Sequence, residues 1–187
     1  MVARHAHDRA VDGQLVETGA DTSADTSART TVPGAQRRAT GPRPSTELRT
    51  LPGRLEWNAA LDRESVRAAR YRRPTAVAIV ELKAAKAGQS VDPWLGSLAG
   101  PIARSLRSDS RATDLVARVA GSRFQMLLPE TSEAGAEHLA ERIATTCRTY
   151  IQTTGAPVIV RVSVAGTGLD DSLHEALAHA LRTIEAA

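Results

Sequence analysis

The sequence has few aromatic residues, a single cysteine and no long hydrophobic run. Only 3% of its 187 residues are aromatic. Because Cys147 is the only cysteine, the chain cannot form an intrachain disulfide. A structural zinc site is also excluded, because no second cysteine and no cluster of histidines is present. No apolar run reaches the roughly 18 residues of a membrane span, and the N-terminus lacks a signal-peptide core. We therefore expect a soluble, cytoplasmic protein without a metal or cofactor.

Lysine is also scarce, because Lys83 and Lys86 are the only lysines among 24 basic residues. The other basic residues are arginines, and they alternate with 21 acidic residues to leave a net charge of +3. A small, dispersed surplus of charge neutralises few phosphates, so nucleic acid is not the expected partner.

The first part of the chain lacks the residues that build a core. Residues 1–45 contain no Phe, Trp, Tyr or Ile, and their only leucine is Leu15. Such a segment cannot bury enough apolar surface to offset the entropy cost of ordering it. We predict a disordered, low-complexity tail over 1–45 and one domain over 46–187. The tail could be a spacer, or its Ser and Thr residues could be phosphorylated or contact a partner.

Hydrophobic periodicity divides the domain into helices and strands. Strands are predicted at 75–82, 114–121, 123–129 and 157–165, and helices at 54–73, 97–107, 132–151 and 171–185. Leu55, Ala59 and Val66 recur at helical spacing in the first helix. The second and third strands form a hairpin that turns near Gly121. This order predicts an α/β (α+β) fold in which a central mixed sheet carries helices on both faces.

Several motifs follow one another in the order and spacing of a known family. TELRTLPGRLEW is similar to an entry motif, RRPTAVAIVELK to a first core strand, and VIVRVSVAGTG to a closing strand. RATDLVARVAGSRFQMLLPETSEAGAEHLAERIA is the most similar segment, because it combines the hairpin with its Leu-Leu-Pro-Glu-Thr exit and the helix that follows. Together they resemble the GGDEF family of diguanylate cyclases, which implies a nucleotide-cyclase palm-like fold.

The positions that resemble the cyclase active site carry unsuitable residues. Arg123 stands where the family's signature has a metal-binding carboxylate, and Ala120 replaces its first glycine. Glu81 and Lys83 stand at the two aspartate positions of the first strand, and Glu185 at a phosphate-binding lysine. Joining two GTP molecules requires divalent metal held by carboxylates. We therefore expect no catalytic residues and no cyclase activity; a residual diguanylate cyclase is the less favoured alternative.

A second ligand site of the family is retained in the sequence. Arg111 and Asp114 form an Arg-x-x-Asp motif five residues before the altered signature, and Arg142 matches a further arginine in the following helix. The resemblance implies a product-binding inhibitory site, and arginine can bind phosphate or guanine through two hydrogen bonds. The alternative is that Arg111 and Asp114 form a solvated pair and that Arg142 pairs with Glu137 or Glu141.

Two functions follow from these residues. The first is a catalytically inactive signalling protein that binds cyclic di-GMP through Arg111, Asp114 and Arg142 and acts through a protein partner. The second is a ligand-free interaction or dimerisation module on the same scaffold. The sequence identifies neither the partner nor the oligomeric state.

Overall fold

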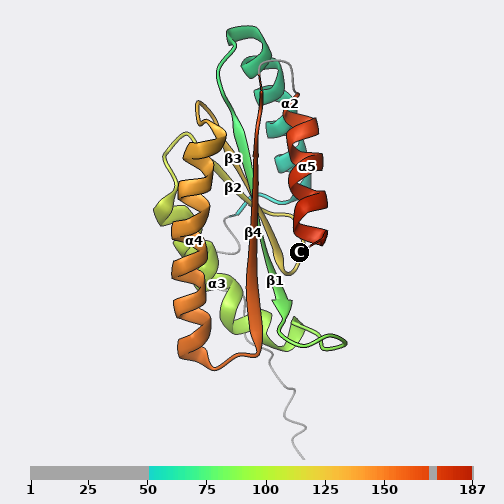
Figure 1. The fold of residues 1–187 in the computed structure, drawn as a ribbon, viewed down its shortest axis with the longest axis vertical. Coiled ribbons are helices and arrows are strands. Elements are labelled where there is room, and N and C mark those ends of the chain that lie inside the picture. Colours follow the sequence, from blue (N-terminus) through green and yellow to red (C-terminus); the bar gives the residue numbers. More distant parts are fainter. Residues whose placement is uncertain (1–50, 169–171, 187) are drawn as a thin grey trace, which may run out of the picture. The chain divides into compact units, whose positions relative to one another are not determined.

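The computed structural model describes residues 51–168 and 172–186. The predicted tail, 1–45, and its boundary lie outside the described residues. The elements in chain order are α2 (Arg54–Tyr71), β1 (Ala76–Ala84), α3 (Asp92–Asp109), β2 (Leu115–Arg118), β3 (Arg123–Leu128), α4 (Glu133–Thr154), β4 (Val158–Gly166) and α5 (Leu173–Ala186) (Figure 1). Within the described part of the chain, no helix is long and apolar enough to cross a membrane.

The four strands form one sheet in the order β2-β3-β1-β4, and every neighbouring pair is antiparallel. The predicted mixed sheet is therefore wrong in this respect. The hairpin is the physical reason: β2 runs in the same direction as β1, but β3 lies between them. The predicted strand at 75–82 corresponds to β1, which lies between β3 and β4, and the side chains of residues 76–80 are fully buried.

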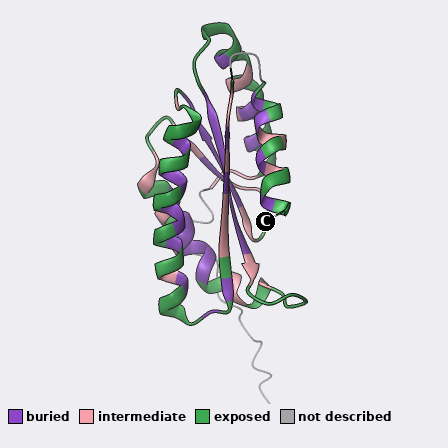
Figure 2. Ribbon diagram, viewed as in Figure 1, coloured by how far each residue is buried: buried purple, intermediate pink, exposed green. Residues whose placement is uncertain are grey.

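Helices cover both faces of the sheet, as the sequence predicts. Alternate residues of β1 point to opposite faces, which divides the core into two clusters. Ala78 and Val80 pack in the cluster formed with α3 and α4, whereas Val77 and Ile79 pack in the cluster formed with α2 and α5. Figure 2 shows buried residues along β1 and on the inward sides of the helices. This arrangement confirms the α+β, palm-like fold class.

Helix α2 turns a different side inward from the one that its aliphatic spacing indicates. Trp57, Leu61 and Ala68 are buried, whereas Leu55 is 83% exposed and Val66 is 71% exposed. Trp57 has the largest apolar surface of the helix, so its burial determines which side of the helix faces the sheet.

Helix α3 begins earlier than predicted. The sequence predicts this helix at 97–107, but it starts at Asp92 and contains Pro93 in its first turn. The Ser90 hydroxyl accepts a hydrogen bond from the Asp92 amide at 3.1 Å and thereby stabilises this earlier start. Pro101 consequently lies inside the helix. Helix α4 begins where the sequence predicts, and Ser132 caps it, because Ser132 Oγ accepts from the Gly135 amide at 3.3 Å.

Candidate functional site

Glu81 and Arg123 lie opposite each other where β1 meets the start of β3. The two residues are register partners in the antiparallel ladder. Arg123 donates to Glu81 Oε1 from Nη2 at 2.7 Å and from Nε at 3.1 Å. The Glu81 side chain is only 9% exposed and the Arg123 side chain 23%. This is a partly buried, charge-assisted contact between the two positions that resemble a metal-binding pair.

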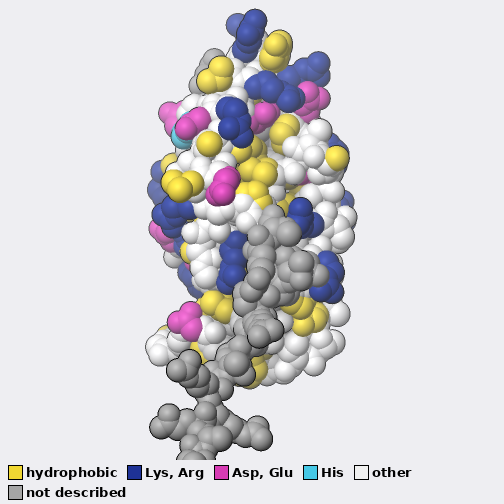
Figure 3. Space-filling model, turned by 180° about the vertical axis from the view of Figure 1, so that it is seen from behind, with side chains coloured by type: hydrophobic (Ala, Val, Ile, Leu, Met, Phe, Trp, Pro, Cys, Tyr) yellow, Lys and Arg dark blue, Asp and Glu magenta, His cyan; other side chains and the backbone are white. Residues whose placement is uncertain are grey.

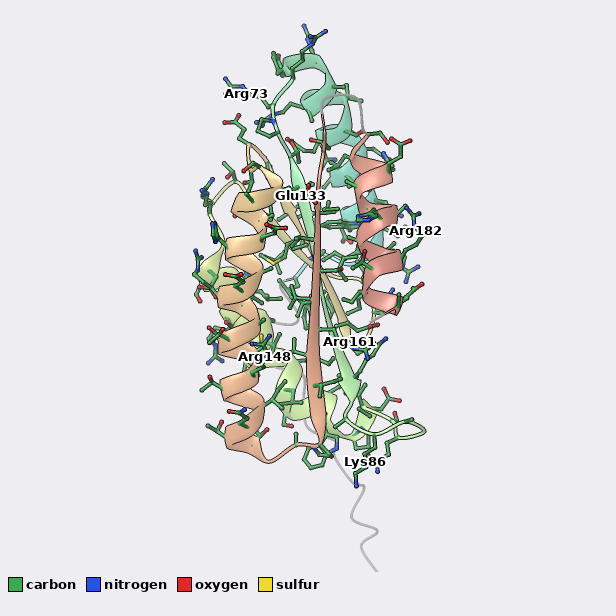
Figure 4. All side chains as sticks on the ribbon, viewed as in Figure 1. Arg73, Lys86, Glu133, Arg148, Arg161 and Arg182 are labelled. Atoms are coloured by element: carbon green, nitrogen blue, oxygen red, sulfur yellow. The ribbon has the colours of Figure 1, made fainter. Side chains whose placement is uncertain are left out.

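Further charges surround this pair. Lys83 Nζ lies 3.3 Å from Glu81 Oε2, an oxygen that accepts no hydrogen bond. On α5, Glu185 Oε1 lies 3.7 Å from Arg123 Nη2. Arg161 of β4 is the register partner of Glu81 on its other side, and Figure 4 labels it on that strand. Glu81 is therefore bracketed by cationic residues from β3 and β4, with a third cation from its own strand.

The hairpin turn next to this pair is held by the chain itself. Ala120 and Arg123 exchange backbone hydrogen bonds of 3.3 Å across the turn. Arg118 Nε donates to the Gly121 carbonyl at 3.1 Å, and the same guanidinium lies over the Phe124 ring. Burial lowers the pKa of Arg118 from its ordinary value. Its guanidinium is thus engaged with the turn.

A hollow of about 420 Å³ adjoins the end of β1. Glu81, Lys83 and Lys86 line it together with Ser122 of the hairpin turn and Asp92 at the start of α3. Figure 4 labels Lys86 in the loop that follows β1. The residues that the sequence assigns to the altered cyclase site therefore do come together. Among the described residues, no group of three or more His, Cys, Asp or Glu side chains could hold a metal ion.

Arg111 and Asp114 lie in the turn between α3 and β2. Asp114 Oδ2 accepts a hydrogen bond from the Arg111 backbone amide at 2.7 Å, and the Asp114 amide donates to the Arg111 carbonyl at 3.1 Å. The motif therefore closes a turn through its backbone, with the Arg111 side chain exposed. Asp114 Oδ1 is buried and has no hydrogen-bond partner. The spacing of the motif does not predict that one Asp114 oxygen accepts a hydrogen bond while the other accepts none.

Arg142 lies on the exposed side of α4. No hydrogen bond or ion pair joins the side chains of Arg111, Asp114 and Arg142 to one another. Arg142 also forms no ion pair with Glu137 or Glu141. The structure therefore brings none of the three predicted ligand-binding side chains into direct contact.

Two other features bear on chemistry and binding. Cys147 is buried, and burial together with Asp109 raises the pKa of its thiol to about 11, so it is a poor nucleophile at neutral pH. On the face shown in Figure 3, basic side chains occupy several separate places with acidic groups among them. That distribution agrees with the dispersed charge of the sequence.

Comparison with known proteins identifies the scaffold. Residues 47–187 match the family model described as "Diguanylate cyclase, GGDEF domain". No curated protein matches the chain. Among solved structures, the chain is similar to the GGDEF domain of YfiN from Pseudomonas aeruginosa, with 26% identity, a TM-score of 0.59, and coverage of 78% of this chain and 88% of that one.

Two further structures share the fold at lower identity. Diguanylate cyclase SiaD from P. aeruginosa, solved in complex with its activator SiaC, has 24% identity and a TM-score of 0.62 over 76% of this chain. The match spans only 56% of the SiaD chain. The GGDEF domain of DgcB from Caulobacter crescentus, solved in complex with c-di-GMP, has 17% identity and a TM-score of 0.59 over 80% of this chain and 91% of that one. The family match spans most of the sequence, and the chain belongs to the GGDEF domain family.

Proposed function

We propose that this chain is a GGDEF-domain signalling protein that has no diguanylate cyclase activity and acts by binding. The observation that carries the proposal is the ion pair between Arg123 and Glu81. Arg123 places a fixed cation against the one carboxylate of β1 that could have held a metal.

A divalent ion would meet an unfavourable environment at this position. Metal-assisted phosphoryl chemistry needs carboxylate oxygens that are free to coordinate Mg²⁺ or Mn²⁺. Glu81 Oε1 already accepts two hydrogen bonds from Arg123, and Lys83 lies beside Oε2. A metal would have to displace or approach these cations in a site of reduced dielectric, where charge repulsion is strong. The residues present do not fit the metal that the family's chemistry requires.

The test is incubation of the purified full chain with GTP and Mg²⁺ or Mn²⁺, with separation of the products by chromatography. We expect GTP to remain unconverted. Cyclic di-GMP formation by the protein, abolished by Glu81→Gln, would contradict the proposal. A contaminating cyclase would instead leave the product unchanged in that variant, so Glu81→Gln is the matched control.

Cyclic di-GMP binding at Arg111, Asp114 and Arg142 is the second part of the proposal. It is supported by Asp114 Oδ1, a buried acceptor without a hydrogen bond, next to the exposed side chain of Arg111. Guanidinium groups can bind phosphate or guanine through two hydrogen bonds, and a carboxylate can accept from guanine N–H groups. The complex of DgcB with c-di-GMP is a precedent on the same fold.

Isothermal titration calorimetry with cyclic di-GMP tests this site. We expect Arg142→Ala to weaken binding by at least about tenfold, because one charge-assisted contact is lost. Arg148→Ala is the control, since Arg148 is exposed on the same helix six residues beyond Arg142. No binding at tens of micromolar ligand, or equal effects of the two substitutions, would contradict this part.

A ligand-free interaction module is the alternative function. It is favoured by the absence of any direct contact among the Arg111, Asp114 and Arg142 side chains, and SiaD, solved with its activator, is a precedent for a protein partner on this fold. Mass spectrometry of the protein as purified, together with a thermal-shift series over GTP, GDP, cyclic di-GMP and cyclic di-AMP, distinguishes the two functions. A tight ligand at 100 times its dissociation constant stabilises by roughly 2.7 kcal/mol, whereas the module requires no shift with any of them.

A further inference from the structure

The two edges of the sheet differ in how they are covered. The edge strand β2 has four residues, and its Arg118 amide donates to the Pro52 carbonyl at 2.9 Å. The opposite edge strand, β4, has nine residues and pairs only with β1. Among the described residues, the outward side of β4 takes part in a single hydrogen bond, from the Val158 amide to the Ala156 carbonyl at 2.8 Å. This edge is a template for another strand.

The hydrogen bonds at both ends of β4 show which of its backbone groups face outward. The Ala85 amide donates to the Pro157 carbonyl and the Thr167 amide to the Thr75 carbonyl, each at 2.8 Å. Hydrogen-bonded pairs alternate along an antiparallel ladder, so the odd-numbered residues of β4 bond to β1. Five even-numbered residues therefore direct their N–H and C=O groups away from the sheet: Val158, Val160, Val162, Val164 and Gly166.

The outward groups have the spacing that self-pairing requires. Val162 is the middle residue of β4. If a second copy of the strand runs antiparallel around a two-fold axis at Val162, Val160 lies opposite Val164 and Val158 lies opposite Gly166. Every outward residue then meets another outward residue. The complete strand can form up to about eight ladder hydrogen bonds, because the Val158 amide of each copy already donates to the Ala156 carbonyl. No residue of the strand is left unpaired in this register.

The side chains are compatible with the same register. Arg161, the only charged residue of β4, lies opposite Ser163 of the second copy and not opposite another arginine. Ile159, which is 39% exposed, lies opposite Ala165 of the second copy. Cross-strand pairs of β-branched residues stabilise a sheet, and three valines on the other face provide them. The lysine, proline or bulge that commonly protects an edge strand is absent from residues 158–166.

We propose that β4 pairs with β4 of a second copy of this chain and forms one continuous sheet across a homodimer. Figure 1 shows β4 in front of the other strands, with α4 on one side and α5 on the other, and no described segment crosses in front of it. A foreign peptide could also add to this edge, but the symmetric register and the absence of charge repulsion favour the chain itself. The proposal does not rest on the loss of cyclase activity.

Sedimentation velocity of the full chain over a concentration series tests the dimer. We expect a shift from monomer to dimer as concentration rises, and Val162→Pro should move the midpoint at least tenfold higher. Proline removes the amide that bonds across the two-fold axis but no hydrogen bond within the subunit. Ala134→Pro, in the exposed first turn of α4, is the matched control and should leave the midpoint unchanged. A monomer at every concentration up to hundreds of micromolar, or a dimer insensitive to Val162→Pro, would overturn the proposal.

Disulfide trapping tests the register even if Val162→Pro fails to fold. Opposed residues in a non-hydrogen-bonded pair have Cα atoms about 4.5 Å apart, which a disulfide can span. We expect a mixture of Ile159→Cys and Ala165→Cys chains to form a cross-linked dimer under mild oxidation. Neither variant should cross-link by itself, because identical positions would lie about 20 Å apart along the strands. Cys147 packs on the opposite face of the sheet from Ala165 and should not compete. Cross-linking of one variant alone, or none in the mixture, would contradict this register.

Discussion

Two corners of this GGDEF domain carry arginine and acidic residues, but they use them differently. At the hairpin, Arg123 turns inward and donates to Glu81, with distances of 2.7 and 3.1 Å. At the turn before β2, Asp114 accepts from the backbone of Arg111, and the Arg111 side chain remains exposed. At the hairpin, the charged side chains of Arg123 and Glu81 bond to each other. At the turn before β2, the Arg111 guanidinium is exposed and available to a ligand.

The difference shows why residue identity alone does not define a binding site. An arginine whose donors are already used by a partly buried carboxylate contributes to the folded structure, and removing it leaves a buried charge uncompensated. An exposed arginine contributes little to stability and keeps its donors for phosphate or guanine. Substitutions at the two corners should therefore separate stability from binding.

The largest expected effect is that of Arg123→Glu. The substitution replaces the cation between Glu81 and Glu185 by a third carboxylate, so the partly buried Glu81 loses its partner and gains a like charge. We expect the free energy of unfolding in urea to fall by about 3–5 kcal/mol. Mn²⁺ or Mg²⁺ should recover part of the loss, because three converging carboxylates are suitable ligands for a divalent ion.

Arg148→Glu is the control for this comparison. It makes the same charge reversal at an exposed position on α4, which Figure 4 labels, and should change the free energy of unfolding by no more than about 0.5 kcal/mol. If the two variants lose equal stability, or if Arg123→Glu loses none, Arg123 does not compensate the negative charge of Glu81.

Much of the fold could be predicted from sequence because its signals are local and strong. The continuous apolar run that includes residues 76–80 indicates a strand buried on both faces, and the structure places β1 at the centre of the sheet. Two features depended on tertiary packing. The inward side of α2 is determined by Trp57 and not by the spacing of Leu55 and Val66, and the antiparallel sheet results from the position of β3.

The candidate site was predictable in composition but not in contacts. The resemblance to the family motif places Arg123 and Glu81 at related positions, yet only the register of β1 and β3 shows that they bond directly. The Arg111 and Asp114 motif was identified by spacing, which cannot reveal that Asp114 bonds the Arg111 amide and not its guanidinium. Side-chain rotamers and backbone geometry decide these contacts, and neither follows from residue order.

Asp114→Ala should have an intermediate effect. The substitution removes the acceptor of the Arg111 amide at 2.7 Å and opens the turn that leads into β2. We expect a loss of about 1.5–3 kcal/mol in the free energy of unfolding, the usual contribution of a hydrogen bond to a charged group. Asp114→Asn keeps one acceptor oxygen and should lose less. Thr113→Ala, at an exposed neighbouring position, should be neutral. An equal loss there would show that the effect is not specific to the hydrogen bond of the Asp114 carboxylate.

Arg111→Ala should have the smallest effect on stability and a large effect on binding. Its side chain is exposed and forms no hydrogen bond within the described residues, so the free energy of unfolding should change by less than about 0.5 kcal/mol. If Arg111 binds cyclic di-GMP, the dissociation constant should rise at least about tenfold, equivalent to roughly 1.4 kcal/mol. Arg111→Lys should recover only part of the affinity, because lysine keeps the charge but loses the paired donors. Full recovery by lysine would indicate charge attraction alone, and unchanged binding in Arg111→Ala would leave this corner as a structural turn.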